Sequence, residues 1–261
     1  MDVVKLYREG PVVTLAISYP KARNALSKAV VDQLVSHLAY LRAEPIRALI
    51  LTGEGGHFCA GAHLGELAES LQEPGAGQRE ATGLAALYAA LLHFPHLTVA
   101  AVEGSAYGGG AGLACACDFV VASPTAVLQF SELRLGFIPA LISVFLTRRL
   151  APSPLAKLFL NPRPIAAEEG VKLGLVDELS DKPQIRAREL ASEVAAKTAP
   201  SAVKSCKRWL LELSQPQLDQ FLARAAQVNA QQREQEEFRL GVEFFLQTKK
   251  FRNWLEEEES Y

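Results

Sequence analysis

The sequence has no long apolar segment and no block of basic residues. None of its apolar runs reaches the roughly 18 residues of a membrane span, and its first residues lack the basic flank and apolar core of a signal peptide. Its 27 Lys and Arg residues nearly balance 29 Asp and Glu residues, which gives a formal net charge of −2. Because no lysine or arginine cluster is present, we expect a cytoplasmic protein that binds neither nucleic acid nor a membrane.

Cysteine is also scarce. The four cysteines, Cys59, Cys115, Cys117 and Cys206, are too few for a disulfide framework in a chain of 261 residues. We expect reduced thiols, with Cys115 and Cys117 as small core residues on an apolar helix. Hydrophobic residues make up 49% of the chain and charged residues 21%, the balance of an ordinary globular protein.

Strand and helix patterns alternate over the first 150 residues or so. Apolar runs predict strands at 12–17, 47–52, 98–102 and 118–123. Ser27 is a candidate cap for a helix whose apolar residues recur at helical spacing, namely Val30, Val31, Leu34, Leu38 and Leu41. This alternation predicts an α/β layer with buried strands.

The second part of the chain is mostly helical. The segment AAEEGVKLGLVDEL predicts a helix that Gly174 ends, followed by a short strand. Beyond Lys182 we expect helices at about 184–198 and 200–214 and one long helix at about 217–247, punctuated by Pro200 and Pro216. We divide the chain into an α/β core at 1–195 and a C-terminal helical region at 196–261.

Two glycine-rich turns follow predicted strands. AYGGGAGL leads from the strand at 98–102 into a helix expected to begin near Ala111, and HFCAGAHL follows the strand at 47–52. Neither turn has the spacing of a dinucleotide-binding glycine motif or the lysine of a P-loop. Ser105 in GSAYG stands one place too early for a nucleophile elbow.

Glycine turns of this kind admit a ligand to main-chain N–H groups, although a tight strand–helix packing turn would look the same in sequence. Two of them can aim two N–H donors at one carbonyl oxygen. That arrangement is an oxyanion hole, in which a single donor contributes about 3 kcal/mol to the stability of a transition state.

Together, FCAGAHL, GSAYGGGAGLACACD and FSELRLGFIPA, in this order, resemble the enoyl-CoA hydratase/isomerase (crotonase) superfamily. PKARNALS and AAEEGVKLGLVDEL fit as well, so the resemblance covers essentially the whole chain. It implies a spiral of ββα repeats followed by C-terminal helices that make a homotrimer, often paired as a hexamer. It also implies an acyl-CoA thioester substrate and no cofactor beyond the coenzyme A of that substrate. We expect no metal, because the spacing of His57, Cys59 and His63 matches no common zinc site and lacks a fourth ligand.

The resemblance assigns residues by position. The N–H groups of Ala62 and Gly109 correspond to the family's oxyanion hole, and Glu132 to one of its two catalytic glutamates. The remaining acyl-CoA-binding positions correspond to Lys21, Ala22, Arg23, Ala60, Gly61, Leu64, Gly108 and Gly112.

The chain departs from the family at three positions. Gly112 stands where typical hydratases carry the other glutamate. His63 replaces the usual aspartate of the first turn, either as a polar residue that begins a helix or as an imidazole that touches the ligand. Gly65 replaces a lysine near the coenzyme A phosphates, so phosphate contact is expected from Arg23, or from Lys249 and Lys250 of a neighbouring subunit.

A lone glutamate leaves several reactions open. Hydration of a trans-2-enoyl-CoA is favoured, because FSELRLGFIPA resembles a hydratase branch of the family. A 3,2-enoyl-CoA isomerase would use Glu132 as a proton shuttle and would need no water. A non-catalytic acyl-CoA-binding paralogue, a thioester hydrolase and a decarboxylase are further alternatives.

Overall fold

Two sheets organise the protein, a computed structural model that describes residues 2–70 and 73–255. Within these residues the larger sheet has the strand order β1-β2-β3-β4-β6-β9. β1 and β2 are antiparallel, and every later neighbour pairs in parallel. The strands are β1 (Val4–Glu9), β2 (Val12–Ile17), β3 (Ala48–Gly53), β4 (Leu97–Val102), β6 (Phe119–Ala122) and β9 (Glu178–Leu179).

The smaller sheet is built from short strands that follow the long ones. It pairs β5 (Ser105–Tyr107) with β7 (Val127–Gln129) and β8 (Ile165–Ala166). Isolated bridges extend it from Ala106 to Cys59 and from Ala62 to Leu26. A long strand, a short extended segment and a helix therefore recur along the chain, which confirms the predicted ββα repeats.

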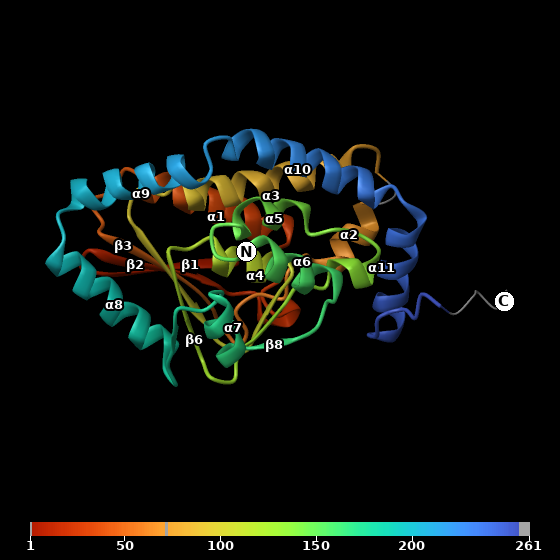
Figure 1. The fold of residues 1–261 in the computed structure, drawn as a ribbon, viewed down its shortest axis with the longest axis horizontal. Helices are drawn as coiled ribbons and strands as arrows, with labels where there is room; N and C mark the ends of the chain where they lie inside the picture. The colour runs from red at the N-terminus through yellow and green to blue at the C-terminus, as the bar shows by residue number, and fades with distance from the viewer. Residues whose placement is uncertain (1, 71–72, 256–261) are drawn as a thin grey trace.

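Helices cover both faces of the larger sheet (Figure 1). α8 packs on β3, β4 and β6, while α1, α3, α5 and α10 pack together on the other side. The α-helices are α1 (Lys28–Leu41), α2 (Leu64–Ser70), α3 (Ala76–Leu92), α4 (Gly109–Cys115), α5 (Ala140–Leu146), α6 (Pro152–Leu160), α7 (Ala167–Leu173), α8 (Pro183–Lys197), α9 (Pro200–Ser214), α10 (Leu218–Arg233) and α11 (Glu236–Thr248). Short 3-10 helices lie at η1 (Pro20–Ala22) and η2 (Glu132–Leu135).

The local sequence accounts for most of these elements. β3 and β4 are buried at every position because helices cover both faces of the sheet. The Ser27 hydroxyl accepts a hydrogen bond from the Val30 N–H at 3.3 Å and caps α1, as predicted. Cys115 and Cys117 are buried, as predicted, but Cys117 lies just beyond the end of α4 and not on the helix. α4 begins at Gly109, two residues before the expected start.

The predicted long helix at 217–247 is wrong. The chain leaves the helical conformation at Gln235, so α10 and α11 are separate, and α11 packs on α2 and η2 (Figure 1). A side chain at Gly241 would meet the Leu135 backbone, its carbonyl oxygen at 2.6 Å. Residues 234–237 include no helix breaker, so this close packing against η2, and not local propensity, sets the break.

The predicted boundary at residue 195 lies in the last turn of α8. Large apolar side chains on α9 and α10 are more than half exposed, namely Trp209, Leu210, Leu213 and Phe221. Such side chains suit a subunit interface, but trimer or hexamer formation stays a prediction, as does the domain division. Among the described residues, no helix has the length and apolar character needed to cross a bilayer.

Candidate active site

The two glycine turns lie directly against each other. The Tyr107 N–H donates to the Cys59 carbonyl at 2.9 Å, and the Leu26 N–H donates to the Gly61 carbonyl at 2.7 Å. Gly61 has a φ of 84°, and a Cβ there would stand 2.5 Å from the Tyr107 carbonyl oxygen and 3.5 Å from the Gly109 nitrogen. The close contact and the left-handed backbone both require glycine at 61.

The N–H groups of Ala62 and Gly109 lie at this junction. Gly109 is the first residue of α4, whose N-terminus leaves backbone donors without a partner inside the helix. Within the described part of the chain, neither N–H donates to a backbone or side-chain acceptor. The geometry therefore leaves both predicted donors available to a ligand oxygen.

A cavity of about 790 Å³ opens at the junction of the turns. Ten of the predicted site residues line it: Lys21, Ala22, Arg23, Ala60, Gly61, Ala62, Leu64, Gly108, Gly109 and Glu132. Gly112 is not in its wall. Sequence reasoning missed other lining residues, among them Gln129, Phe137, Phe245, Leu246 and Phe251.

Glu132 is buried in the wall of this cavity. It begins η2, and only 6% of the residue is exposed. Its Oε2 atom has no hydrogen-bond partner, and its Oε1 atom would lie 3.1 Å from a Cβ on Gly108. Burial raises the pKa of Glu132 to about 7, although the N–H groups of Glu132 and Ser131 act in the opposite direction. A carboxyl group with this pKa can both accept and donate a proton near neutral pH.

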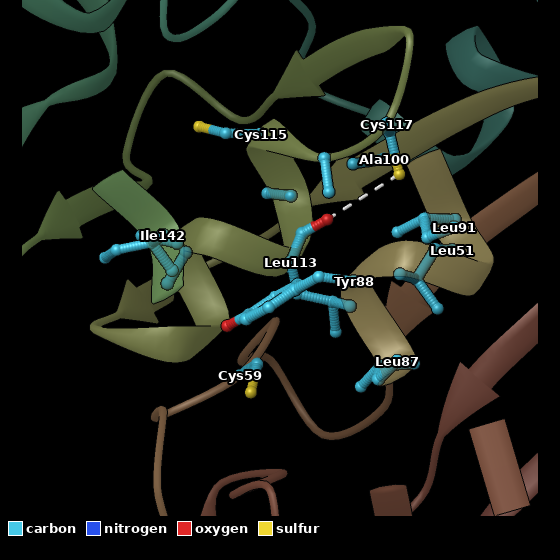
Figure 2. Packing of buried hydrophobic residues seen from close by; sticks show 14 of the residues in the cluster. Leu51, Cys59, Leu87, Tyr88, Leu91, Ala100, Leu113, Cys115, Cys117 and Ile142 are labelled. Carbon is cyan, nitrogen blue, oxygen red and sulfur yellow. Dashed lines mark hydrogen bonds between the residues drawn. The ribbon is translucent and has the colours of Figure 1, made fainter. Parts of the chain in front are cut away.

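The place of the missing glutamate is filled by apolar packing. A Cβ on Gly112 would collide with the Cγ2 atom of Ile142 and lie 3.1 Å from the Tyr88 hydroxyl. Figure 2 shows Tyr88 and Ile142 beside the helix that carries Leu113. Gly112 therefore lies behind the cavity wall, and this space admits no second carboxylate.

Tyr88 instead stabilises the start of α4. Its hydroxyl donates to the Gly109 carbonyl at 2.8 Å, and the side chain is fully buried. Burial also raises the pKa of Tyr88, so the hydroxyl stays a neutral donor. In the sequence, Tyr88 is one apolar position among many in a helical pattern, and nothing marks it as a partner of the glycine turn.

Gln129 adds a polar group that the sequence did not suggest. It ends β7, it lines the same cavity as Glu132, and its side chain is buried. Its Nε2 atom has no hydrogen-bond partner. Burying an amide without a partner costs about 1–3 kcal/mol, so a ligand or water that accepts from it would recover free energy.

Basic residues lie at the cavity mouth. Lys21 and Arg23 belong to a turn that the buried Asn24 holds through hydrogen bonds to the carbonyls of Glu54 and His57. Lys249 follows α11 and lines the cavity of its own chain, whereas a contribution from a neighbouring subunit stays a prediction. The break between α10 and α11 brings it there.

His63 precedes α2 and lies at the cavity rim. Its Nδ1 atom accepts the Glu66 N–H at 3.1 Å, and its ring stacks on Tyr19 with the centroids 6.0 Å apart. The imidazole therefore begins the helix, as the simpler interpretation predicted, and it also lines the cavity.

Comparison with known proteins agrees with this geometry. The model of the enoyl-CoA hydratase/isomerase family matches residues 8–256. The chain belongs to this family. It is therefore an enzyme of the enoyl-CoA hydratase/isomerase family, whose members act on acyl-CoA thioesters.

Relatives of this family match the chain over nearly its whole length. A Thermus thermophilus protein with a provisional enoyl-CoA hydratase name is 38% identical and covers 92% of this chain and 96% of its own. The 2,3-dehydroadipyl-CoA hydratase of Escherichia coli is 32% identical over 95% of this chain and 96% of its own. The crystal structure of an enoyl-CoA hydratase from Mycobacterium avium is 28% identical, covers 97% and 100% of the two chains, and superposes with a TM-score of 0.84.

Restoring the family's second glutamate should fail in this enzyme. We expect Gly112→Glu to lower the free energy of unfolding by about 2 kcal/mol or more, because the new side chain collides with Ile142. Ile142→Ala opens a cavity and is destabilising by itself. Combined, the two changes should be less destabilising than their sum by about 1 kcal/mol or more, as measured by urea unfolding. Strict additivity would contradict this packing.

The buried Glu132 carboxyl should also make stability depend on pH. Its pKa of about 7 in the folded protein exceeds the ordinary value of 4.5, so the folded state favours the protonated form. The contribution of the protonated carboxyl to the free energy of unfolding is present at low pH and is lost as the pH rises from about 4.5 to about 7. Above pH 7 we expect Glu132→Gln to be more stable than the wild type, by up to about 3 kcal/mol.

Urea unfolding of both proteins at pH 5 and pH 8 measures this difference. Glu168→Gln, which removes an exposed carboxyl group on α7, is the matched control. An equal effect of Glu132→Gln at both pH values would show that the carboxyl titrates normally.

Proposed function

We propose that this enzyme hydrates a trans-2-enoyl-CoA to a 3-hydroxyacyl-CoA with Glu132 as its only catalytic carboxylate. The observation that supports this most is the unpartnered Glu132 oxygen, in the same cavity as the unpaired N–H groups of Ala62 and Gly109. A proton-transfer group and two donors for a thioester oxygen are the parts that this reaction requires.

The reaction proceeds through an enolate. The ionised Glu132 removes a proton from water as the oxygen of that water bonds to C3 of the enoyl group. Electrons move through C2 to the thioester oxygen, which accepts hydrogen bonds from the N–H groups of Ala62 and Gly109. Glu132 then returns the proton to C2, the thioester carbonyl re-forms, and the carboxylate is regenerated.

Gln129 supports hydration over its alternatives. Its unpartnered Nε2 is a donor and the unpartnered Oε2 of Glu132 is an acceptor, and both residues line one cavity. A water molecule can accept from the amide and donate to the carboxylate at the same time. We infer that Gln129 positions the water for which typical hydratases use a second glutamate.

The basic mouth of the cavity suits coenzyme A. Lys21, Arg23 and Lys249 offer positive charge to its phosphates, and the substrate needs no further cofactor. Assembly into a homotrimer or hexamer and a cytoplasmic location remain predictions.

Isomerisation of a 3-enoyl-CoA is the second candidate. It is favoured by the space at Gly112, where Ile142 excludes a second carboxylate, because moving one proton from C2 to C4 needs only one base. The intact Glu132 and both free N–H groups disfavour a non-catalytic acyl-CoA-binding protein. A thioester hydrolase or decarboxylase would use the same N–H groups, but no observation favours either.

Two substrates distinguish a hydratase from an isomerase. We expect crotonyl-CoA to lose its conjugated enoyl absorbance in the presence of the enzyme, because water adds across the double bond. Hydration should fall by about a hundredfold or more in Glu132→Gln, which cannot accept a proton. A gain of absorbance with 3-hexenoyl-CoA, and no reaction of crotonyl-CoA, would identify an isomerase.

Gln129→Leu tests the role in water positioning. It should lower kcat for crotonyl-CoA while leaving any turnover of 3-hexenoyl-CoA unchanged, because isomerisation uses no water. Equal decreases in kcat for both substrates would contradict the role of Gln129 in positioning water. If the wild-type enzyme turned over none of a series of 2-enoyl and 3-enoyl thioesters, this result would contradict the proposed function.

A further inference from the structure

A second cavity continues from the junction of the glycine turns. It has a volume of about 490 Å³, and Ala62 and His63 line both cavities. Leu26 and Leu84 line it as well, and their side chains would lie 3.2 and 3.9 Å from a Cβ on Gly109. An acyl chain whose thioester oxygen is held by Ala62 and Gly109 therefore has direct access to this second cavity.

An ion pair between Arg233 and Glu80 lines the second cavity. Arg233, the last residue of α10, is 8% exposed and donates from Nη1 to Oε2 of Glu80 on α3 at 2.6 Å. The Nε atom of Arg233 is buried without a partner. The Nε atom of Arg233 thus keeps an unused donor at a cavity that both apolar and charged residues line.

The charges around this cavity argue against an anionic ligand. Lys28, Arg79 and Arg233 line it, against four carboxylates: Asp32, Glu66, Glu73 and Glu80. Each cation is paired with one carboxylate, and Glu66 accepts the backbone N–H of Lys28 at 2.7 Å. Because the carboxylates outnumber the cations by one, a further carboxylate would enter a site that is already negative.

A hydroxyl group fits the ion pair better. It can accept a hydrogen bond from Arg233 and donate one to Glu80, whose side chain is 30% exposed. A methyl terminus can do neither, and it would leave the Nε donor buried without a partner, at a cost of about 1–3 kcal/mol.

We propose that the second cavity is an acyl-chain subsite and that Arg233 and Glu80 select acyl groups bearing a hydroxyl at or near the far end. This inference rests on the proposed function for its acyl-CoA substrate and names the class of that substrate. Arg233 and Glu80 determine specificity, and they take no part in proton transfer.

Saturated thioesters test the subsite without turnover. Binding of hexanoyl-CoA, 6-hydroxyhexanoyl-CoA and adipyl-CoA to the wild-type protein is measured by calorimetry, together with the corresponding octanoyl series to cover the reach of the cavity. We expect the hydroxyacyl thioester to bind about tenfold more tightly than the methyl-ended one in at least one series, the value of one net hydrogen bond to a charged group. The carboxylate-ended thioester should bind more weakly than the hydroxyacyl one.

A double variant provides the second test of the subsite. Arg233→Met alone would leave the partly buried Glu80 without its ion-pair partner, so Arg233→Met is combined with Glu80→Gln. The variant should lose the preference for the hydroxyl and bind hexanoyl-CoA at least as tightly as the wild type, because the unpartnered Nε donor is gone. Arg224→Met, at an exposed position of the same helix, is the matched control and should keep the preference.

Several results would overturn this proposal. They are equal affinity for hydroxyl and methyl ends in both series, tighter binding of the carboxylate end, or a preference that survives in the double variant. Because these thioesters do not react, a hydroxyl preference without hydration of any enoyl-CoA would support the subsite and contradict the proposed function. Hydration of an enoyl-CoA without the hydroxyl preference would support the proposed function and contradict the subsite.

Discussion

The close contact of the two glycine turns is the constraint on which the rest of the site depends. A backbone hydrogen bond from Tyr107 to Cys59 joins them, and the space beside Gly61 is too small for any side chain. Because the turns follow β3 and β4, which are parallel neighbours in the main sheet, their donors converge at one edge of that sheet. Oxyanion stabilisation thereby becomes a property of the fold, and the rigid sheet holds it in place.

Burial gives the lone carboxylate its chemistry. Glu132 has no ion-pair partner among the described residues, and desolvation raises its pKa to about 7. A glutamate with an ordinary pKa would be a weak base and a rare acid at neutral pH, whereas this one is suited to both steps of a proton transfer. The cost is a loss of stability as the pH rises from about 4.5 to about 7, which the apolar packing of Ile142 and Tyr88 around α4 helps to offset.

The sequence predicted those features that local motifs encode. The buried strands, the Ser27 cap and ten lining residues of the cavity lie within short segments whose residue types and order are characteristic. Contacts between distant segments were missed. Tyr88, Ile142 and Arg233 occupy ordinary positions of helical patterns, and only packing shows that they close the space at Gly112 or line the second cavity. The break before α11 also has no local signal, so the place of Lys249 could not be deduced.

The central claim is that one buried carboxylate performs both proton transfers, and the pH dependence of kcat/KM for crotonyl-CoA tests it most directly. The reaction begins with ionised Glu132, so the account predicts a single rising limb with an apparent pKa near 7, a plateau above it, and loss of the limb in the residual activity of Glu132→Gln. A profile that is flat between about pH 5 and 9, or a limb that persists in Glu132→Gln, would show that another group moves the proton.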